Sequence, residues 1–388
     1  MRDQWQSGCD EARIREALVG RRVLLTGHTG FKGGWLALWL TRLGAHVVGV
    51  ALPPEPGSSM FEAAGIADAI DSRFGDIRSP ESFAAAVGDF DAEVVFHLAA
   101  QAIVRRSHAD PVDTFLTNTV GTAVVLDAAR RMPSLRAIVV VTSDKCYENR
   151  EWAWGYRESD ALGGADPYSA SKACTEIVAA CYRRSFFAGA EGPQLATVRG
   201  GNVIGGGDWS ADRLLPDIVR AVLADTPVLI RNPGSVRPWQ HVLDALSGYL
   251  TVAARLLEDG ADVAEAWNFG PDPRGYVDVE TIAGMTARAW GPGGPRFGFG
   301  SDGGPHEASL LGLDSAKAAA RLGWRPTLDL GQAIAMTTDW YRHWADGRHD
   351  MGALSRAQIA AFIDAAALAD RPRSHSRFEF AGDRQQCA

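Results

Sequence analysis

The sequence lacks any uninterrupted apolar run of about 18 residues, the length that a membrane-spanning helix requires. Its first segment, residues 1–20, lacks the apolar centre of a secretory signal peptide. An excess of basic residues is also absent, because the net charge is −8, and this argues against a broad nucleic-acid-binding or anionic-membrane surface. We therefore expect a cytoplasmic protein with no nucleic-acid partner and no membrane partner.

Cysteine is scarce, and its spacing excludes two classes of site. The five cysteines are Cys9, Cys146, Cys174, Cys181 and Cys387. Their number is odd and no two form a C-x-x-C pair, which disfavours both a disulfide framework and a zinc site. We expect free thiols in a reducing compartment, and no metal. The length of 388 residues predicts two or three domains.

A glycine-rich turn follows the first predicted strand. The apolar run Arg22–Thr26 leads into Gly27, Gly30 and Gly33, and a helical pattern begins at Lys32. In a dinucleotide-binding turn the first glycine permits the tight turn, the second lets a pyrophosphate approach the backbone, and the third lets the helix lie close to the strand. The free N–H groups of a helix N-terminus favour an anion. The stretch predicts a dinucleotide site, with a plain βα turn as the alternative.

Strand and helix patterns alternate along the first half of the chain. The predicted strands are 22–26, 46–51, 72–76, 94–99, 137–142 and 195–199. The predicted helices are 32–43, 80–87, 111–131 and 167–187, the last two with N-caps at Asp110 and Asp166. Repeated β-α units of this length predict an α/β fold with a Rossmann-type doubly wound parallel sheet, in which ligands bind beyond the carboxyl ends of the strands.

Beyond Arg199 this regularity fails, which predicts a smaller, mixed C-terminal substrate domain. We expect a dinucleotide-binding domain of residues 1–198 plus about 238–270, and a substrate-binding domain of 199–237 plus 271–350. Residues 351–388 are expected to form a C-terminal helix and a polar tail.

The end of the second predicted strand carries no acid, since Val50-Ala51-Leu52-Pro53 stands there. An acid near this position normally binds the ribose 2′-hydroxyl of NAD. The ribose site alone therefore does not distinguish NAD from NADP. Asp76 ends the third strand, and it either accepts a hydrogen bond from an adenine amino group or serves only as a turn residue.

Tyr168 and Lys172 give the strongest chemical signal. They are four residues apart in a predicted helix and therefore share one face. A phenol has a pKa of about 10, and a nearby ammonium together with a nicotinamide cation would lower the pKa of Tyr168. The phenolate could then remove a proton from a sugar hydroxyl while hydride leaves the same carbon. An ordinary Tyr and Lys on a helix are the alternative.

Five motifs together resemble the extended short-chain dehydrogenases/reductases that act on nucleotide sugars, across about residues 20–350. They are Thr26-Gly-His-Thr-Gly-Phe-Lys-Gly33, His97-Leu-Ala-Ala-Gln101, Tyr168-x-x-x-Lys172, Arg199-Gly-Gly-Asn202 and Arg237-Pro-Trp-Gln-His-Val242. The resemblance implies NAD as cofactor. The residues implied at NAD are Gly27, Thr29, Gly30, Phe31, Lys32, Gly33, Asp76, Ile77, Leu98, Ala99, Ala100, Gln101, Thr117, Tyr168 and Lys172.

Two stretches resemble the CDP-glucose 4,6-dehydratases more closely: Gly27-His-Thr-Gly-Phe-Lys-Gly-Gly-Trp-Leu36 and Thr142-Ser-Asp-Lys-Cys-Tyr147. Related dTDP- and GDP-sugar dehydratases typically carry Glu where this chain has Lys145, and 4-epimerases lack the acidic pair. The resemblance implies oxidation of CDP-glucose at C4, loss of water across C5–C6 and return of hydride to C6. The alternatives are another nucleotide-hexose 4,6-dehydratase or 4-epimerase, and a dinucleotide-sensing protein with an idle site.

The resemblance implies five catalytic residues: Ser143, Asp144, Lys145, Tyr168 and Lys172. Tyr168 would deprotonate the 4-hydroxyl, and Ser143 would hydrogen-bond the 4-oxygen. Asp144 would protonate the departing 6-hydroxyl, which requires that burial raise its pKa. Lys145 holds the position of the base for the C5 proton; because an ammonium is not a base, it either removes that proton or stabilises the enolate by its charge. A solvated salt bridge is the alternative for Asp144 and Lys145.

The resemblance also implies a diphosphate and nucleoside site, because the arginine fork suits phosphate oxygens. The implied substrate residues are Ser143, Asn202, Arg213, Leu214, Arg237, Asn268, His306 and Glu307, with surface arginines and amide caps as the alternative. It further implies a homodimer, or a dimer of dimers, paired through helices 111–131 and 167–187.

Overall fold

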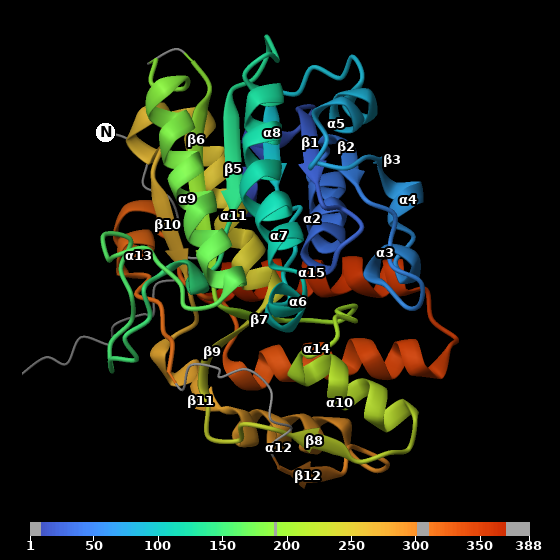
Figure 1. Cartoon of the computed structure of the whole chain (residues 1–388). Helices are drawn as coiled ribbons and strands as arrows, with labels where there is room; N and C mark the ends of the chain where they lie inside the picture. Colours follow the sequence, from blue (N-terminus) through green and yellow to red (C-terminus); the bar gives the residue numbers. More distant parts are fainter. Residues whose placement is uncertain (1–8, 190–191, 301–309, 370–388) are drawn as a thin grey trace, which may run out of the picture.

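The computed structural model describes residues 9–189, 192–300 and 310–369. Within these residues, seven parallel strands form one sheet in the order β3-β2-β1-β4-β5-β6-β10 (Figure 1). The strands are β1 (Arg22–Thr26), β2 (His46–Ala51), β3 (Asp71–Phe74), β4 (Val94–His97), β5 (Ala137–Val141), β6 (Gln194–Gly200) and β10 (Ala266–Phe269). The order reverses between β1 and β4, so the switch point of a Rossmann-type sheet lies beside the glycine-rich turn. The predicted fold class is confirmed.

Helices cover both faces of this sheet. One face carries α5 (Pro80–Val87), α8 (Gly121–Ala129) and α9 (Pro167–Ser185). The other carries α1 (Glu11–Leu18), α2 (Phe31–Arg42), α11 (Val242–Asp259) and α15 (Met351–Ala369). Successive strand residues point to opposite faces, so Leu24 packs in one core while Val23 and Leu25 pack in the other.

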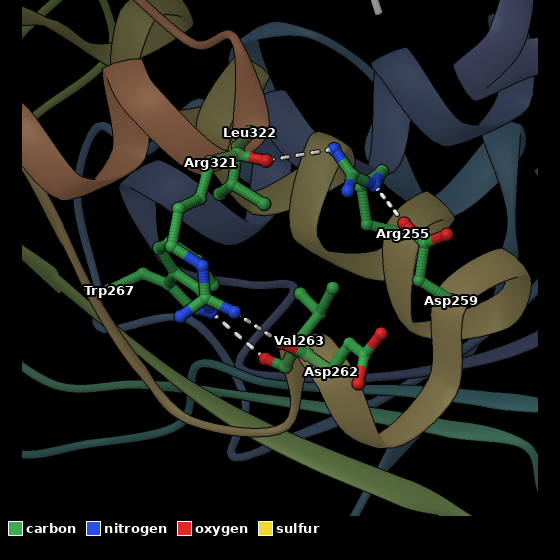
Figure 2. A pocket seen from close by; sticks show the side chains of 7 residues that line it. All are labelled: Arg255, Asp259, Asp262, Val263, Trp267, Arg321 and Leu322. Atoms are coloured by element: carbon green, nitrogen blue, oxygen red, sulfur yellow. Dashed lines mark hydrogen bonds and ion pairs between the residues drawn. The ribbon is translucent and has the colours of Figure 1, made fainter. Parts of the chain in front are cut away.

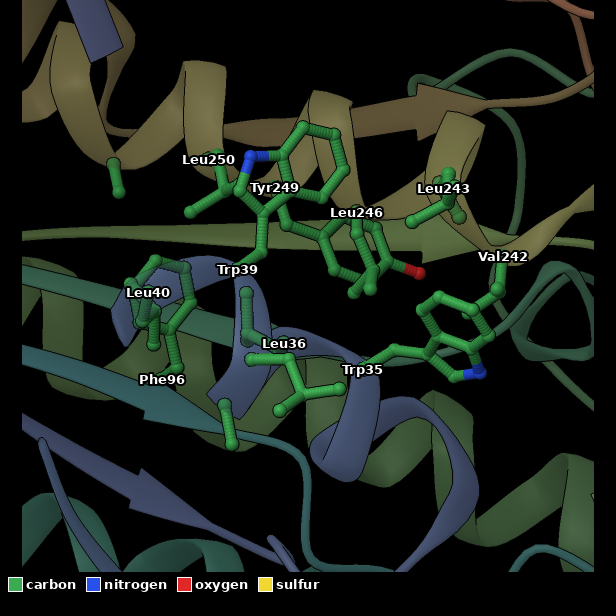
Figure 3. Packing of buried hydrophobic residues seen from close by; sticks show 14 of the residues in the cluster. Trp35, Leu36, Trp39, Leu40, Phe96, Val242, Leu243, Leu246, Tyr249 and Leu250 are labelled. Carbon is green, nitrogen blue, oxygen red and sulfur yellow. The ribbon is translucent and has the colours of Figure 1, made fainter. Parts of the chain in front are cut away.

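The core between α2 and α11 is built from large side chains (Figure 3). Trp35 and Trp39 of α2 are fully buried and lie against the apolar face of α11, which includes Leu246 and Tyr249. The indole Nε1 of Trp35 donates to the carbonyl oxygen of Gly206 at 2.8 Å. The helix that begins at the glycine-rich turn is therefore joined directly to the C-terminal half of the chain.

A smaller group of elements lies beyond the carboxyl ends of the parallel strands, at the bottom of Figure 1. It contains the mixed sheet β7 (Asn202–Ile204), β9 (Val236–His241) and β11 (Tyr276–Asp278), and the pair β8 (Val228–Ile230) and β12 (Phe297–Phe299). Its helices are α10 (Leu214–Leu223), α12 (Val279–Trp290) and α14 (Leu330–Asp346). The division into domains at residues 198 and 199 stays a prediction.

The predicted helix 111–131 is not uniform. It consists of α7 (Pro111–Phe115), the π-helical turn η1 (Leu116–Val120) and α8, and it ends at Ala129. The carbonyl oxygen of Asn118 accepts hydrogen bonds from the hydroxyls of Thr122 and Thr175, at 2.7 and 2.8 Å. These two donors compete for the carbonyl within the helix, which explains why the helix widens at this point.

Short elements were not predicted, because helices of one or two turns carry too little periodicity to recognise. They are α3 (Met60–Ala63), α4 (Ile66–Ala69), α6 (Val104–Ala109), η2 (Asp144–Cys146), η3 (Gly260–Val263) and η4 (Pro273–Gly275), whereas α13 (Ala316–Leu322) lies where the family resemblance implies a helix and turn.

The edge strand β10 has its outer backbone groups capped by side chains. Glu158 Oε1 accepts from the backbone N–H of Asn268 at 2.8 Å, and the Lys317 ammonium donates to the carbonyl oxygen of Ala266 at 2.7 Å. Just beyond the strand, the N–H of Gly270 donates to the Ser315 hydroxyl at 2.8 Å. The edge is therefore closed by polar contacts instead of by another strand.

Two further observations concern the chain as a whole. No helix in residues 9–189, 192–300 or 310–369 has an apolar window long enough for a bilayer. Cys9, Cys146, Cys174 and Cys181 are free thiols, and Cys387 lies outside the described residues.

Candidate active site

The glycine-rich turn is shaped by contacts that only glycine permits at two of its three positions. Gly27 has φ +79°, and a Cβ there would lie 2.7 Å from the backbone N of Ala99. A Cβ on Gly33 would lie 2.1 Å from the carbonyl oxygen of Gly27. At Gly30 the nearest atom would be 3.4 Å away, which is ordinary contact. Gly30 is also the N-cap of α2 and makes no side-chain cap, so the first N–H groups of the helix have no competing side-chain acceptor.

This geometry predicts different effects for two alanine variants. Gly30→Ala should keep the thermal stability of the protein without cofactor, because its Cβ meets no close atom, but should weaken NAD binding about tenfold or more (~1.4 kcal/mol), since a pyrophosphate would contact that methyl group. Gly33→Ala should disrupt the turn itself. Titration calorimetry with NAD and thermal unfolding of both variants check this; unchanged NAD affinity in Gly30→Ala would contradict the proposed approach of the pyrophosphate.

Polar contacts hold the turn against the end of β4. The Thr26 hydroxyl accepts from the N–H groups of Leu98 and Ala99, at 3.1 and 3.2 Å, so its own proton goes to His97 Nδ1, 2.7 Å away. The other ring nitrogen of His97 then donates to Thr122 Oγ1 at 3.0 Å. Burial lowers the pKa of His97 to about 3, which keeps the ring neutral. The predicted cofactor segments 27–33 and 98–101 therefore lie side by side.

The remaining predicted cofactor residues surround this turn. The Thr29 hydroxyl donates to the carbonyl oxygen of Leu52 at 3.0 Å. Asp76 forms an ion pair with Arg78 at 2.7 Å, and the hydrogen bond from Arg78 lowers its pKa. Ile77 is buried beneath Gly121, and Thr117 is half-buried in η1. The contact of Asp76 with adenine stays a prediction.

The predicted catalytic residues come from two adjoining elements beyond the end of β5. Ser143 and Asp144 are buried in the turn that contains η2, and Ser143 Oγ donates to Asp144 Oδ1 at 2.9 Å. Tyr168 and Lys172 are buried on α9, whose N-cap Asp166 accepts from the N–H of Ser169 at 2.9 Å. The turn that contains η2 packs against α9, and Ser143 is near enough to Tyr168 to oppose the rise of its pKa. Lys145, in the same turn, is half-buried.

Asp144 has the environment of a buried acid. Burial raises its pKa, and the opposing effects of Lys145, Ser143, Arg237 and Lys32 do not cancel that rise. Its second oxygen, Oδ2, has no hydrogen-bond partner among the described residues. A carboxyl of this kind holds a proton and can donate it. The alternative of a solvated salt bridge is excluded by the burial of Asp144.

The pKa of Tyr168 is raised by its surroundings in the polypeptide. Burial raises the pKa of Tyr168 to about 12, although the Ser143 hydrogen bond and the charge of Arg213 oppose the rise. The lowering expected from Lys172 together with a nicotinamide cation stays a prediction, because only the first of these two charges belongs to the polypeptide. The free-energy cost of removing a phenolate from water exceeds the stabilisation that the nearby protein charges provide.

Lys172 and Lys32 are two lysines with lowered pKa values. Burial lowers the pKa of Lys172 to about 8, and its ammonium donates to the carbonyl oxygen of Val141 at 3.4 Å. The pKa of Lys32 is lowered to about 8 by burial and by the charges of Arg213 and Lys172. Positive charge is therefore concentrated between the glycine-rich turn and α9, where a diphosphate or a developing oxyanion would be stabilised.

Turnover is expected to fall as the pH rises through about 8, because the ammonium of Lys172 then loses the proton whose charge favours a phenolate on Tyr168. Turnover measured between pH 6 and 10 checks this (roughly two units either side of that pKa). Lys32→Met is the control, since it removes the other lysine with a pKa near that value and should retain the alkaline limb. Loss of the limb in this variant would contradict the assignment to Lys172.

The predicted substrate residues fall into three groups. Arg213 at the N-cap of α10 pairs with the buried carboxylate of Asp208 at 3.2 Å, and Leu214 follows it as the first residue of the helix. Arg237 on β9 is buried near enough to Asp144 to oppose the rise of that pKa, and Asn202 begins the neighbouring strand β7. His306 and Glu307 lie outside the described residues.

Asn268 has a different environment from the one predicted. It is fully buried on β10; its Oδ1 accepts from the Tyr147 hydroxyl at 2.7 Å, and its Nδ2 donates to the carbonyl oxygens of Tyr156 and Asp314, at 2.8 and 3.2 Å. These bonds use both ends of the amide. A direct contact with the nucleotide would require that they break.

Sequence reasoning missed two buried groups that support the site. Asn118 in η1 donates to Ser171 Oγ at 2.8 Å and accepts from the N–H of Gln101 at 2.8 Å, which links the predicted cofactor segment to α9. Glu176 of α9 forms a buried ion pair with Arg199 at 2.8 Å. The signal for Glu176 was available, because it lies four residues after Lys172 and therefore on the same helical face.

A cavity of about 230 Å³ lies elsewhere, at the far end of α11 (Figure 2). Its charged residues are already paired: Arg255 with Asp259, and Arg321 with the carbonyl oxygen of Asp262. None of the predicted catalytic residues lines this cavity. Within the described ranges, no three His, Cys, Asp or Glu side chains cluster as metal ligands.

Comparison with known proteins decides the family. The sequence model of the NAD dependent epimerase/dehydratase family matches residues 23–270. The chain belongs to this family. Among its relatives, the CDP-glucose 4,6-dehydratase of Salmonella typhimurium is 47% identical over 350 residues, which cover 89% of this chain and 97% of the relative. A dTDP-glucose 4,6-dehydratase of Streptomyces antibioticus is 31% identical over 253 residues, covering 65% of this chain and 71% of the relative.

Solved structures of other epimerases and dehydratases share the fold. UDP-glucose 4-epimerase of Thermus thermophilus, in complex with NAD, has a TM-score of 0.70 at 24% identity and covers 83% of this chain and 99% of its own. dTDP-glucose 4,6-dehydratase of Bacillus anthracis, in complex with NAD, has a TM-score of 0.68 at 20% identity and covers 84% of this chain and 97% of its own. At these identities the likeness concerns the fold alone.

Proposed function

We propose that the protein is an NAD-dependent CDP-glucose 4,6-dehydratase, a hydro-lyase that converts CDP-D-glucose to CDP-4-dehydro-6-deoxy-D-glucose. One observation carries the proposal: Asp144 is a buried carboxyl with a raised pKa, in a turn that packs against α9, the helix of Tyr168 and Lys172. A 4-epimerase needs no acid to expel a hydroxyl, whereas elimination does. The 47% identity to a CDP-glucose 4,6-dehydratase supports the same reaction and the same nucleotide.

NAD fits the residues of the first βα turn. Gly30 leaves space at the N-terminus of α2, because a Cβ there would meet no close atom, and Lys32 adds positive charge nearby. When bound, NAD accepts hydride from C4 of the sugar and returns it to C6. The cofactor contacts of the other predicted residues, including Asp76 and Thr117, are part of this proposal.

The protein side chains move the protons. Tyr168 takes the proton of the 4-hydroxyl, while Ser143 donates a hydrogen bond to the 4-oxygen and Lys172 supplies positive charge. The C4 ketone acidifies the C5 proton, and Lys145 either removes that proton or stabilises the resulting enolate. Asp144 donates its proton to the departing 6-hydroxyl, which leaves as water. Ser143, Asp144, Tyr168 and Lys172 are buried, which excludes solvent from the reactive intermediate.

Arg213 and Arg237 are proposed to bind the diphosphate, with Asn202 and Leu214 against the nucleoside. Both arginines lie near the catalytic turn, since each affects the pKa of Asp144 or Tyr168. His306 and Glu307 are proposed at the ribose. The buried environment of Asn268 gives no support to a substrate contact.

We also propose a homodimer formed through α7, η1, α8 and α9. Four apolar side chains are exposed there: Val112 by 67%, Leu116 by 43%, Val120 by 44% and Ile177 by 58%. Helices α7 and η1 both contact α9. Exposed apolar side chains gathered on one face favour a partner surface, and a second copy would bury the same residues about a two-fold axis. A dimer of dimers and a cytoplasmic location stay predictions.

Leu116→Asp is expected to convert a dimer into a monomer of 41.6 kDa, because it introduces a charge into the proposed apolar interface. Light scattering after size-exclusion chromatography measures the mass. Leu229→Asp is the matched control, since Leu229 is 50% exposed on β8, away from this face, and the variant should remain dimeric. A dimeric Leu116→Asp variant would contradict the proposed interface.

The test of the reaction is direct. Purified protein is incubated with NAD and with CDP-, dTDP-, GDP- or UDP-glucose, and loss of one water is followed by mass spectrometry. We expect dehydration of CDP-glucose ahead of the others. Unchanged mass for all four sugars would remove the dehydratase proposal and leave the 4-epimerase and the dinucleotide sensor as the alternatives. Preference for dTDP-glucose, the substrate named for the relative of 31% identity, would overturn the nucleotide assignment.

A further inference from the structure

Beneath the catalytic residues lies a buried ion pair that the proposed mechanism does not use. Glu176 and Arg199 are 2% and 3% exposed. Two hydrogen bonds join them: Arg199 Nε donates to Glu176 Oε1 at 2.9 Å and Nη2 donates to Oε2 at 2.8 Å. Glu176 lies on the same face of α9 as Tyr168 and Lys172, one turn beyond Lys172 and two turns beyond Tyr168.

The pair contacts both ends of the turn that carries the acid. Before the turn, Thr142 Oγ1 donates to Glu176 Oε1 at 2.5 Å. After the turn, Arg199 Nη1 donates to the Tyr147 hydroxyl at 2.7 Å, and the guanidinium lies 4.9 Å from the centre of the Tyr147 ring. Thr142 and Tyr147 therefore flank Ser143, Asp144 and Lys145 in the sequence. Glu176 on α9 binds Thr142, and Arg199 on β6 binds Tyr147.

We infer that the Glu176–Arg199 ion pair positions the turn that carries Asp144. By binding Thr142 and Tyr147, the pair keeps Asp144 at a fixed distance from Tyr168. Glu176 and Arg199 are positioning residues, because neither is proposed to touch substrate or cofactor. The inference rests on the proposed function for the roles of Asp144 and Tyr168.

Stability alone does not explain this pair. Removing two charges from water is costly, and well-packed apolar residues often replace a buried ion pair without loss of stability. Here the pair also makes bonds to three side chains outside itself, Thr142, Thr197 and Tyr147, and two of the three bound the catalytic turn. A charge effect acts in the same direction, since Glu176 raises the pKa of Lys172 against the effect of burial.

The same network accounts for the buried amide of Asn268. The Tyr147 hydroxyl donates to Asn268 Oδ1 at 2.7 Å, and Asn268 Nδ2 continues to the carbonyl oxygens of Tyr156 and Asp314. The turn is thus anchored through Tyr147 to the edge strand β10 and through Thr142 to α9. In this account Asn268 supports the turn and does not read the nucleotide.

Two threonines allow a matched test. Thr142 and Thr197 each donate one hydroxyl to the Glu176 carboxylate, at 2.5 and 2.8 Å, and both are buried. Only Thr142 adjoins the catalytic turn, because Thr197 lies within β6. Replacing either by valine removes one hydrogen bond from the same carboxylate while the ion pair stays intact.

The experiment compares Thr142→Val, Thr197→Val and Thr142→Ser with the wild-type protein. We expect kcat of Thr142→Val to fall about 10- to 100-fold, since a misplacement of about 1 Å can cost as much as 100-fold. The KM for CDP-glucose should stay unchanged, and reduced nicotinamide should accumulate, because oxidation proceeds while elimination is slowed. Thr142→Ser restores the hydroxyl and should restore kcat. Thr197→Val should retain kcat at a similar loss of thermal stability.

Tyr147→Phe provides a second variant that removes the other contact and keeps the ring. It should also let reduced nicotinamide accumulate. Equal kcat values for Thr142→Val and Thr197→Val would overturn the inference, as would a loss of kcat in both that follows their melting temperatures. Crystal structures in which Thr142→Val keeps Asp144 at its wild-type distance from Tyr168 would overturn it independently of activity. Failure of the wild-type protein to dehydrate any sugar would instead remove the proposed function.

Discussion

Asp144→Asn is expected to lower kcat for dehydration by about 10²- to 10⁴-fold, the usual contribution of a positioned acid or base. The amide cannot donate a proton to the departing 6-hydroxyl, whereas oxidation at C4 does not use Asp144. The raised pKa of the carboxyl favours its neutral form, and the neutral amide has the same charge as that form and approximately the same shape. Reduced nicotinamide should therefore appear at once and persist, as measured by its absorbance in stopped flow.

Asp244→Asn is the matched control for the loss of a buried carboxyl. Burial raises the pKa of Asp244 to about 7, and its Oδ1 accepts from the N–H of Thr327 at 2.6 Å, on the far side of α11 from the catalytic turn. An asparagine oxygen can accept the same bond, so turnover should be retained. If Asp144→Asn turns over like the wild type, another group supplies the proton and the assignment of the acid is wrong.

Tyr168→Phe is expected to lower the rate of the first step by about 10²- to 10⁴-fold, because no other group is proposed to take the proton of the 4-hydroxyl. Unlike Asp144→Asn, this variant should produce no burst of reduced nicotinamide on mixing with CDP-glucose. The buried ring remains in place and only its hydroxyl is lost, so thermal unfolding should change little.

The two variants test the order of the steps as a pair. Accumulation of reduced nicotinamide in Tyr168→Phe would show that another base starts the oxidation. Absence of accumulation in both variants would show that Asp144 is needed before elimination, or that the sugar does not bind. Equilibrium binding of CDP-glucose to each variant separates these last two results.

The local sequence was sufficient for the elements with strong internal signals. Asp166 followed by Pro167 marks the start of α9, and the structure confirms the cap with a bond from Ser169. The β-branched run of β5 predicted a central strand, and it is buried along its whole length. The glycine spacing predicted the close approach of helix and strand, which the contact of Gly33 with Gly27 confirms. In these cases the cause of the structure lies within a few residues.

Features that depend on distant partners could not be predicted in this way. The π-helical turn η1 depends on Thr175, which is 57 residues from Asn118 in sequence. The environment of Asn268 depends on Tyr147, 121 residues away. The raised pKa of Tyr168 depends on burial by several elements at once. A motif specifies which side chains are present, but their solvent exposure and partners are decided by tertiary packing.

The closed edge of β10 has a consequence for how copies of the protein can meet. An open strand edge invites backbone pairing between molecules, which is the first step of fibrous aggregation. Glu158 and Lys317 already satisfy the outward amide and carbonyl of this strand, so an incoming strand would have to displace two charged side chains before gaining its first bond. Strand pairing between molecules at this edge is therefore disfavoured, and loss of the Glu158 carboxylate would leave the outward amide of Asn268 available to an incoming strand.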